Sequence, residues 1–393
     1  MGYSALYNMN RTRPIAHYTA DQLVGRLTQA RGRLRALIAC LPQGGWLGPR
    51  VAHLNPPLWE YGHIVWFQER WCLRERSDGR CGDSLLRGAD ALYDSSSVPH
   101  GIRWDLPLPQ PAAVDDYADA VAAAVAGRLR SGFDSDLAYF AELCLYHELM
   151  HIEAWWMAFQ SLGYAPPALA DVAAPQSVQR LTLPDGEVEL GSGPDAGFIF
   201  DNEKWRHTVP VSAFDIDASP VPETAFAEFV DAGGYQHKTL WSEAGWEWRT
   251  ASDASHPLYW RQEKGSWQVR RFDRWLPLHA DVPMLHVNRY EAEACAAWQG
   301  RRLPTAAQWQ RATAQQTFDW GGAWEWLRDP FVPYPGFEPD PYRDYSQPWF
   351  HTHGELRGGG PVTDGSLKYP GFRNFYLPDR RDPFAGFRTA SAD

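Results

Sequence analysis

Two histidines four positions apart, His147 and His151, constrain this chain more than any other feature of its sequence. They stand in a long amphipathic stretch, and residues four apart on an α-helix lie on one face, about one turn from each other. Both imidazoles can therefore bind one metal ion. Glu153 follows two residues later, and carboxylates commonly orient metal-bound imidazoles. The pattern predicts a metal site on a helix and leaves the identity of the metal open.

The composition of the 393-residue chain argues against several classes of protein. Its net charge of −11 would repel phosphate backbones, so we expect no nucleic-acid partner. It has neither a run of about eighteen apolar residues nor a charged-then-apolar start, which predicts no membrane span and a cytoplasmic location. The five cysteines are scattered without a C-x-x-C pair, as is typical of a reducing compartment. The oligomeric state is left open.

The first 165 residues carry helical patterns. Apolar residues at helical spacing predict four helices, over residues 20–41, 58–75, 112–129 and 136–162. Pro56 and Pro57 stand where the second would begin, and Gly163 where the fourth would end. Asp115 and Asp116 are expected in the first turn of the third, where the helix dipole favours acids. Such helices predict a four-helix bundle, a fold that builds metal sites from facing helices.

The remaining segments are less regular. Residues 77–110 are predicted to form a long loop, and loops of that length are usually functional or disordered. Residues 166–178 are rich in Pro and Ala and are predicted to be a linker. Dense Gly, Pro and Trp then predict an irregular α+β domain over 179–393. Its expected elements are strands at 181–183, 188–190 and 209–216 and helices at 223–232 and 289–299. The sequence thus predicts two domains, 1–165 and 179–393.

A mononuclear metal site needs a third ligand, and His63 is the best candidate. It lies among apolar residues in the middle of the second predicted helix, where a buried imidazole needs a partner. Three neutral imidazoles leave open coordination positions and suit Fe(II), Zn or Cu. A second interpretation takes residues 147–151 as the H-E-x-x-H motif of zinc hydrolases, with Glu148 as general base. Against it, no histidine follows His151 until His207, whereas zincins usually take a further ligand downstream.

An ordered series of motifs runs through the second half of the chain. Its members include Phe200-Asp201-Asn202-Glu203, Pro283-x-x-His286-Val287-Asn288, Gly300-Arg301-Arg302-Leu303-Pro304-Thr305, Trp324-Glu325-Trp326, Leu356-Arg357-Gly358-Gly359, Arg373-Asn374-Phe375 and Phe384-Ala385-Gly386-Phe387-Arg388. The series resembles the formylglycine-generating-enzyme-like domain, a C-type-lectin-related fold, over residues 188–390. True formylglycine-generating enzymes use a late cysteine pair, and no cysteine follows Cys295. The resemblance therefore does not imply that activity.

The N-terminal part resembles the DinB-like helical bundle, whose H-x-x-x-H-x-E motif matches His147, His151 and Glu153. A DinB-like four-helix bundle followed by a formylglycine-generating-enzyme-like domain is the architecture of the ergothioneine sulfoxide synthase family. The resemblance covers nearly the whole chain. It implies a non-haem Fe(II) enzyme that uses O2 to join sulfur from cysteine or γ-glutamylcysteine to hercynine (trimethylhistidine). It also implies that His63, His147 and His151 are the iron ligands.

Departures from the family pattern bear on the donor substrate. The family's Arg-Asn-Trp-Asp is here Arg373-Asn374-Phe375-Tyr376, so the acid that would hold the amino group of a cysteine-type donor is missing. The loop that carries donor-binding arginines is hydroxyl-rich over 92–104 and holds only Arg103. Met150 stands where the family tends to have Gln. The chain therefore looks most like the selenoneine synthase branch, which joins a selenosugar to hercynine. An ordinary thiol-using synthase with a drifted sequence remains the alternative.

The resemblance also implies further site residues. Tyr342 and Tyr345 are the candidates for a tyrosine that donates a proton or hydrogen bond during the oxygen chemistry. The candidates for substrate contact are Tyr93 and Arg103 for the donor, Trp155, Phe375 and Tyr376 for the quaternary ammonium of hercynine, and Asn374 for the wall of the site. Each of these residues also has a structural interpretation, such as core packing, a turn cap or an ion pair. A zinc hydrolase and a non-catalytic lectin-like binder are the competing functions.

Overall fold

The computed structural model describes residues 18–75, 81–167 and 179–392. Contacts within the chain divide it into two compact units. The first unit holds the residues up to Ala158 together with 164–167 and 194–199, and the second holds 159–163 and nearly all of the chain from residue 179 on. The division falls inside one long helix, whose last turn belongs to the second unit. Most of the predicted linker, residues 168–178, lies outside the described residues.

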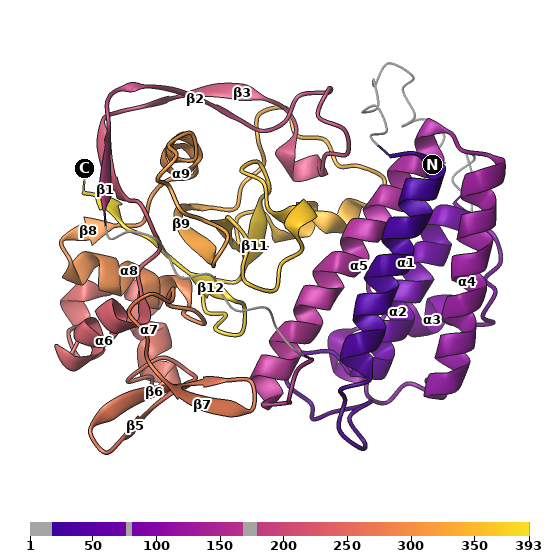
Figure 1. The fold of residues 1–393 in the computed structure, drawn as a ribbon, viewed down its shortest axis with the longest axis horizontal. Coiled ribbons are helices and arrows are strands. Elements are labelled where there is room, and N and C mark those ends of the chain that lie inside the picture. Colours follow the sequence, from indigo (N-terminus) through magenta and orange to yellow (C-terminus); the bar gives the residue numbers. More distant parts are fainter. Residues whose placement is uncertain (1–17, 76–80, 168–178, 393) are drawn as a thin grey trace. The chain divides into compact units, whose positions relative to one another are not determined.

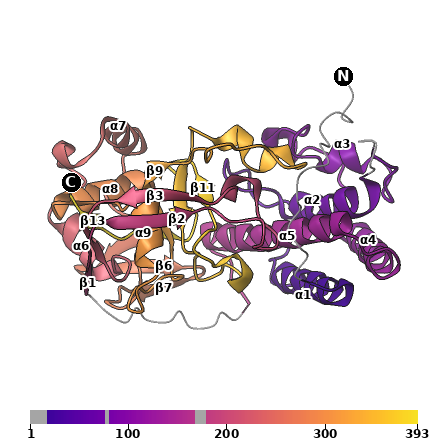
Figure 2. The same cartoon turned by 90° about the horizontal axis from the view of Figure 1, so that it is seen from above.

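Long helices dominate the first unit. They are α1 (Ala20–Ile38), α2 (Pro57–Glu69), α4 (Pro111–Ser131) and α5 (Ser135–Leu162), which run alongside one another in Figures 1 and 2. A capping box between Thr19 and Gln22 starts α1, and a proline at the first helical position starts α2. The predicted four-helix bundle is confirmed. The predicted place of Asp115 and Asp116 is wrong: α4 already begins at Pro111, so both acids lie beyond its first turn.

Helix α2 is the central element of this bundle. All of its residues are buried, because apolar side chains surround the helix and other elements cover every side. It continues into a π-helical turn, Arg70–Arg74. The predicted loop over 77–110 is less irregular than expected, since it contains the short helix α3 (Ala89–Tyr93) and a 3-10 turn, His100–Ile102.

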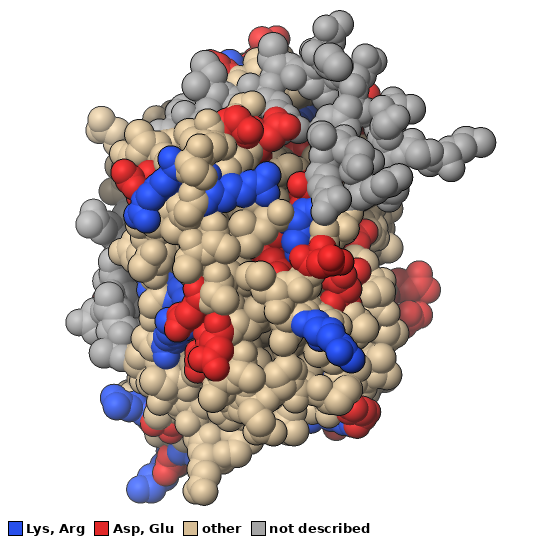
Figure 3. All heavy atoms as spheres, turned by 90° about the vertical axis from the view of Figure 1, so that its right-hand side faces the viewer, with Lys and Arg blue, Asp and Glu red and all other residues tan. Residues whose placement is uncertain are grey.

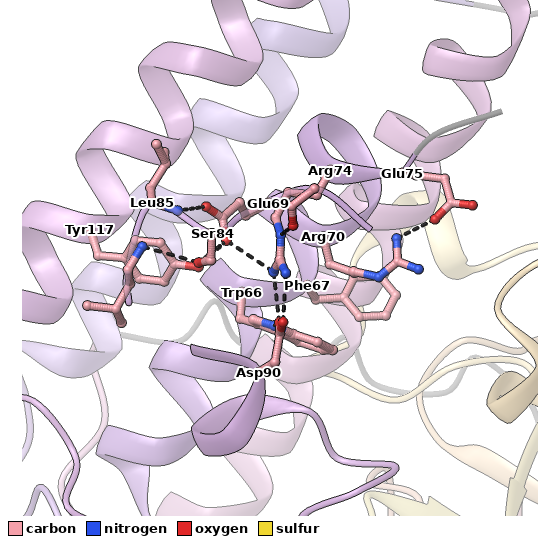
Figure 4. A network of polar contacts seen from close by, with 12 residues as sticks. Trp66, Phe67, Glu69, Arg70, Arg74, Glu75, Ser84, Leu85, Asp90 and Tyr117 are labelled. Atoms are coloured by element: carbon pink, nitrogen blue, oxygen red, sulfur yellow. Dashed lines mark hydrogen bonds and ion pairs between the residues drawn. The ribbon is translucent and has the colours of Figure 1, made fainter. Parts of the chain in front are cut away.

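A polar network ties α3 to the end of α2 (Figure 4). The buried carboxylate of Glu69 accepts hydrogen bonds from the hydroxyls of Ser84, at 2.6 Å, and Tyr117, at 2.8 Å. The guanidinium of Arg74 binds both carboxylate oxygens of Asp90, at 2.8 and 2.7 Å. Bidentate arginine–carboxylate pairs fix direction as well as distance. The network therefore sets the position of α3 and of the backbone that follows it.

Short strands build the second unit. One sheet has the order β11 (Asn374–Tyr376), β10 (Gly354–Arg357), β9 (Trp324–Pro330), β12 (Ala385–Gly386). Another has the order β1 (Arg180–Leu183), β4 (Phe214–Asp217), β13 (Ala390–Ser391), β8 (Arg301–Arg302). Two smaller sheets pair β2 (Gly186–Leu190) with β3 (His207–Val211), and β5 (Trp260–Glu263) with β6 (Ser266–Arg271) and β7 (Arg274–Pro277).

The second unit also carries the helices α6 (Glu223–Asp231), α7 (Glu243–Ser252), α8 (Arg289–Trp298) and α9 (Ala306–Ala312) (Figure 1). The predicted α+β class is confirmed, and so are the helices at 223–232 and 289–299 to within a residue at each end. The single strand expected at 209–216 is wrong, because the chain breaks at Ser212 and Ala213 into β3 and β4. Helices α7 and α9 were missed, since neither has a clear apolar period.

Buried arginines hold this loop-rich unit together. Arg388 and Glu325, both fully buried, form a bidentate pair with one contact at 2.7 Å, and Arg388 also donates to the carbonyls of Asp217 and Ala218. Glu355 lies between two arginines, Arg357 at 2.8 Å and Arg373 at 2.7 Å. Buried charges are tolerated only when paired and hydrogen-bonded, so these contacts fix the loops that carry them.

The surface of the first unit carries both signs of charge. Figure 3 shows lysine and arginine side chains lying next to aspartate and glutamate side chains on the face in view. None of the helices that the structure describes is both long and apolar enough to cross a bilayer.

Candidate metal centre

Three histidines from two helices meet inside the first unit. His63 comes from α2, and His147 and His151 come from α5. One ring nitrogen from each lies within 4.8 Å of those of the other two, and within the described residues this is the one His, Cys, Asp and Glu group of three or more that could hold a metal ion. His63 and His147 are 3% and 5% exposed, and His151 is partly buried. The structure thus brings together the three residues that the sequence pattern singled out.

Hydrogen bonds orient two of the rings. The Nδ1 of His63 lies 2.8 Å from the carbonyl oxygen of Tyr93, and the Nδ1 of His151 lies 2.6 Å from a carboxylate oxygen of Glu60. Both partners accept hydrogen bonds, so each Nδ1 must carry the proton and donate it. The lone pair of each ring is then on Nε2. Contacts of this type fix the tautomer that a metal ligand requires.

Burial also favours the neutral form of two of the rings, His63 and His147. Burial lowers the pKa of His63 and of His147 well below the usual value for histidine, and the neighbouring histidines lower both further. A neutral imidazole keeps the lone pair that binds a metal, whereas an imidazolium has none to offer. Preset tautomers and neutral rings are what a metal ion needs, so these residues fit one.

Aromatic side chains of α2 pack against the ligands. Trp59 stacks on His63 with ring centroids 4.9 Å apart, and Phe67 stacks on His147 at 3.6 Å. The guanidinium of Arg103 lies over the ring of Trp59, 3.8 Å from its centroid. Arg103 also donates to the side-chain oxygen of Asn55 at 2.7 Å. The predicted donor residue Arg103 thus takes part in a layered arrangement of guanidinium, indole and imidazole.

The contacts of Glu148 do not fit the general base of a zinc hydrolase. Its two carboxylate oxygens accept hydrogen bonds from Arg31 at 2.7 and 3.0 Å, and both side chains are buried. An ion pair of this geometry occupies the lone pairs that a general base would use. The second residue of the H-E-x-x-H string therefore belongs to the packing of α1 against α5.

Sequence reasoning missed Glu60. It is 3% exposed and lies on the same helix as His63, three residues earlier. The available signal was an acid within a helix of otherwise apolar character, because buried carboxylates need a partner. Which imidazole it meets was not predictable, since His151 is 91 residues away along the chain.

The other predicted residues of the first unit are buried. Tyr93 is fully buried, and its ring lies so close to Gly62 that a Cβ added there would be 2.2 Å from it. Trp155 is 1% exposed. The Tyr93 hydroxyl and the Trp155 ring nitrogen have no hydrogen-bond partner among the described residues. Contact of Tyr93, Arg103 or Trp155 with a substrate stays a prediction.

Several predicted residues of the second unit gather in one aromatic cluster. Tyr345 stacks on Phe200 with centroids 4.5 Å apart, and its ring also lies 6.4 Å from that of Tyr342 and 6.1 Å from that of Phe375. Burial raises the pKa of Tyr345 well above its usual value, and the carboxylates of Glu203 and Asp201 raise it further. The phenol of Tyr345 is therefore protonated and can donate.

Asn374 and Tyr376 lie on the strand β11, which holds Phe375 between them. The side-chain oxygen of Asn374 accepts a hydrogen bond from the backbone N–H of Phe375 at 2.8 Å, as in a local turn. Phe375 stacks on Phe331 at 4.2 Å, and the guanidinium of Arg380 lies 5.5 Å from the ring centroid of Tyr376. All three predicted residues of this strand are partly exposed.

Two family models match the chain. The DinB superfamily model matches residues 26–155, and the sulfatase-modifying factor enzyme 1-like domain matches residues 168–322. A formylglycine-generating enzyme from Streptomyces coelicolor is 31% identical over 185 residues, which covers 40% of this chain and 56% of that protein. The predicted pair of domain types is therefore confirmed.

Full-length relatives carry both domains. The hercynine oxygenase of Mycobacterium tuberculosis is 31% identical over 389 residues, which covers 86% of this chain and 91% of that protein. The hercynine oxygenase of Mycolicibacterium thermoresistibile is 32% identical over 398 residues, covering 86% and 87% of the two chains. The chain therefore belongs to the family of the hercynine oxygenases, the ergothioneine sulfoxide synthase family that its motifs resemble.

Proposed function

We propose that this protein is a non-haem Fe(II), O2-dependent enzyme that joins hercynine oxidatively to a selenosugar through a new carbon–selenium bond. The observation that supports this most is the three-histidine group, in which burial favours the neutral form of His63 and His147. Hydrogen bonds to Tyr93 and Glu60 set the tautomers of His63 and His151. The relatives that match the chain over most of its length are named hercynine oxygenases, which supports hercynine as one substrate.

The ligand set suits ferrous iron. Three neutral nitrogen donors leave the charge of the ion uncompensated and leave coordination positions open, as non-haem iron chemistry requires. Bound Fe(II) would supply the electrons that allow O2 to react with the organic substrates. The chain's own part is to hold the three rings at fixed distances and, through burial, to keep His63 and His147 unprotonated.

Hercynine carries a quaternary ammonium group, which aromatic faces bind without hydrogen bonds. Phe375, Tyr376 and Trp155 are the aromatic residues that we propose for this contact. Tyr345 is our first candidate for the proton donor, because its phenol is enclosed by Phe200 and stays protonated. Tyr342 lies next to it and remains the second candidate.

The donor is proposed to be neutral and hydroxyl-rich. Tyr376 stands where a cysteine-type donor would need an acid, and the segment around Tyr93 and Arg103 has hydroxyl groups in place of further arginines. Asn374 would complete the wall of the site. The alternative is sulfur transfer from cysteine or γ-glutamylcysteine, which needs charged partners for an amino group and carboxylates.

Oxygen uptake tests the proposal. Fe(II)-loaded protein should consume O2 only when hercynine and a donor are both present, and His63→Ala and His147→Ala should each abolish both iron binding and uptake. His237→Ala, which changes an exposed histidine of the second unit, is the matched control and should retain both. Failure of the wild type to take up O2 with hercynine and any selenol or thiol donor would refute the proposal.

A competition assay addresses the donor. Selenosugar, cysteine and γ-glutamylcysteine are supplied together with hercynine, and the products are separated by mass. We expect the carbon–selenium product to dominate. A product containing only sulfur would leave the enzyme class standing and replace the donor by a thiol.

A further inference from the structure

Helix α2 supplies one metal ligand but contacts all three. Its Trp59 stacks on His63, its Glu60 accepts a hydrogen bond from His151, and its Phe67 stacks on His147. The three rings therefore differ in their partners. His63 donates to a neutral carbonyl, His147 stacks on an aromatic ring, and His151 donates to a carboxylate.

We propose that Glu60 is a positioning residue that orients His151 and strengthens it as an electron donor to a metal ion. The Nδ1–H of His151 and the carboxylate are 2.6 Å apart, a distance typical of a charge-assisted hydrogen bond. Electron density pushed from the carboxylate toward the ring raises the basicity of Nε2, which faces the metal. The inference rests on the proposed function only in taking the three histidines as metal ligands.

Burial makes this contact stronger than it would be in water. Glu60 is 3% exposed, and little solvent competes for its charge. The nearby guanidinium of Arg103 feels the charge of Glu60, which raises its pKa against the larger lowering by burial. A divalent ion at the three rings would be stabilised by the same negative charge.

A purely structural role for Glu60 makes a different prediction. Glu60 stands in the first turn of α2, where any acid gains about 0.3–1 kcal/mol from the helix dipole. If that were all, replacing it would lower the stability of the protein and leave its metal affinity unchanged. Metal affinity therefore separates the two roles.

The experiment compares Glu60→Gln, Glu60→Leu and Glu142→Gln with the wild type. Anaerobic competition with a chromophoric chelator gives the dissociation constants for Fe(II), Co(II) and Zn(II). Gln removes the charge but keeps an acceptor, and Leu removes both, so we expect Kd to rise about 10-fold for Gln and about 100-fold for Leu. Glu142→Gln removes another buried carboxylate of the bundle, on α5, and should leave Kd unchanged.

A spectroscopic measurement follows the hydrogen bond itself. In Zn(II)-loaded protein with ¹⁵N-labelled histidine rings, the Nδ1–H protons of His63 and His151 should both exchange slowly with water. Glu60→Leu should expose that of His151 and spare that of His63, whose partner is a backbone carbonyl. The wild-type spectrum alone is informative, because a rapidly exchanging His151 proton would overturn the proposal even if the variants did not fold.

The outcomes separate the two levels of inference. Wild-type protein that binds no divalent metal would refute both the metal centre and the role of Glu60. Wild-type protein that binds metal, together with a folded Glu60→Gln variant of equal affinity and unchanged His151 signal, would refute the role of Glu60 alone.

Discussion

The two units of this protein hold their buried charges in different ways. In the bundle, long helices fix the backbone, and the polar groups of the core gather around the three histidines and the network of Glu69 and Arg74. In the second unit, strands are only two to seven residues long, and fully buried arginines bind carboxylates on β9 and β10 together with carbonyls of neighbouring segments.

Buried carboxylates show the contrast most directly. Burial raises the pKa of Glu142, in the bundle, to about 7, and Arg26 offsets this only partly. Burial also acts on Glu355, in the second unit, but Arg373 and Arg357 outweigh it and hold its pKa below the usual value. The comparison teaches that burial raises the pKa of a carboxyl group whose cationic partner is weak, whereas two buried arginines reverse that effect.

The largest effect is expected from breaking such a link. Arg388→Met would leave Glu325 buried without its cation and lower the free energy of unfolding by about 3–5 kcal/mol. Chemical denaturation measures the change, with Arg274→Met, which alters an exposed arginine of the same unit, as the control. If Arg388→Met lowered the free energy of unfolding no more than Arg274→Met does, buried ion pairs would not be what stabilises the second unit.

A pH-dependent effect is expected from Glu142→Gln. The folded-state pKa of about 7 lies above the unfolded value, so the folded protein binds an extra proton, and the associated stability is lost as pH rises from about 4.5 through 7. Gln lacks this loss, so the variant should match the wild type near pH 5 and exceed it by about 3 kcal/mol near pH 8.

Chemical denaturation at both pH values measures this difference in stability. The variant Glu355→Gln provides the opposite case. Because the pKa of Glu355 is lowered in the folded state, its charge contributes stability above the unfolded pKa, and this contribution disappears as the pH falls. That variant should therefore be destabilised most at neutral pH. If the stabilities of the two variants depended on pH in the same way, the contrast between Glu142 and Glu355 would be wrong.

Gly62→Ala should lower the unfolding free energy by about 1–3 kcal/mol, because its Cβ would lie 2.2 Å from the ring of Tyr93 and must displace α3. Movement of the Tyr93 carbonyl should also weaken metal binding through His63. Gly25→Ala, on α1 with nothing within 4 Å of the added Cβ, should instead stabilise the protein by about 0.5–1 kcal/mol. Thermal unfolding and metal titration of both variants measure these effects.

The smallest effect is expected at Arg103. Arg103→Met removes the cation over Trp59 and should cost about 0.5–2 kcal/mol of stability. Arg261→Met removes a similar contact over Trp275 from the surface of the second unit and should cost at most about 0.5 kcal/mol. A donor KM that rises in Arg103→Met while metal affinity stays constant would support direct donor contact, and the reverse would assign Arg103 to the stack on His63.

The sequence predicted the bundle well because helical periodicity is a local property. His63 could be named because it interrupts an apolar helix, and His147 and His151 because of their spacing. Glu60 could not be assigned to His151, because that contact depends on how α2 and α5 are placed in register. The place of Asp115 and Asp116 was wrong because α4 begins one residue earlier than predicted, an error typical of helix ends.

In the second unit the motifs predicted the fold, whereas periodicity predicted little of it. Arg357, Arg373 and Arg388 stand in those motifs but look like surface residues by composition, since only tertiary structure reveals their carboxylate partners. The choice between Tyr342 and Tyr345 depends on loops outside regular elements. Tyr345 stacks on Phe200, a contact between residues far apart in the chain, and the role of either tyrosine stays a prediction.

The contacts that hold the histidine rings have a consequence for metal supply. Tyr93, Glu60 and Phe67 fix the rings by themselves, so the bundle can fold before any metal arrives. Metal binding can then follow folding as a separate step. Cells starved of the metal should accumulate intact, inactive protein that becomes active when the metal is supplied, and its abundance should be a poor measure of its activity.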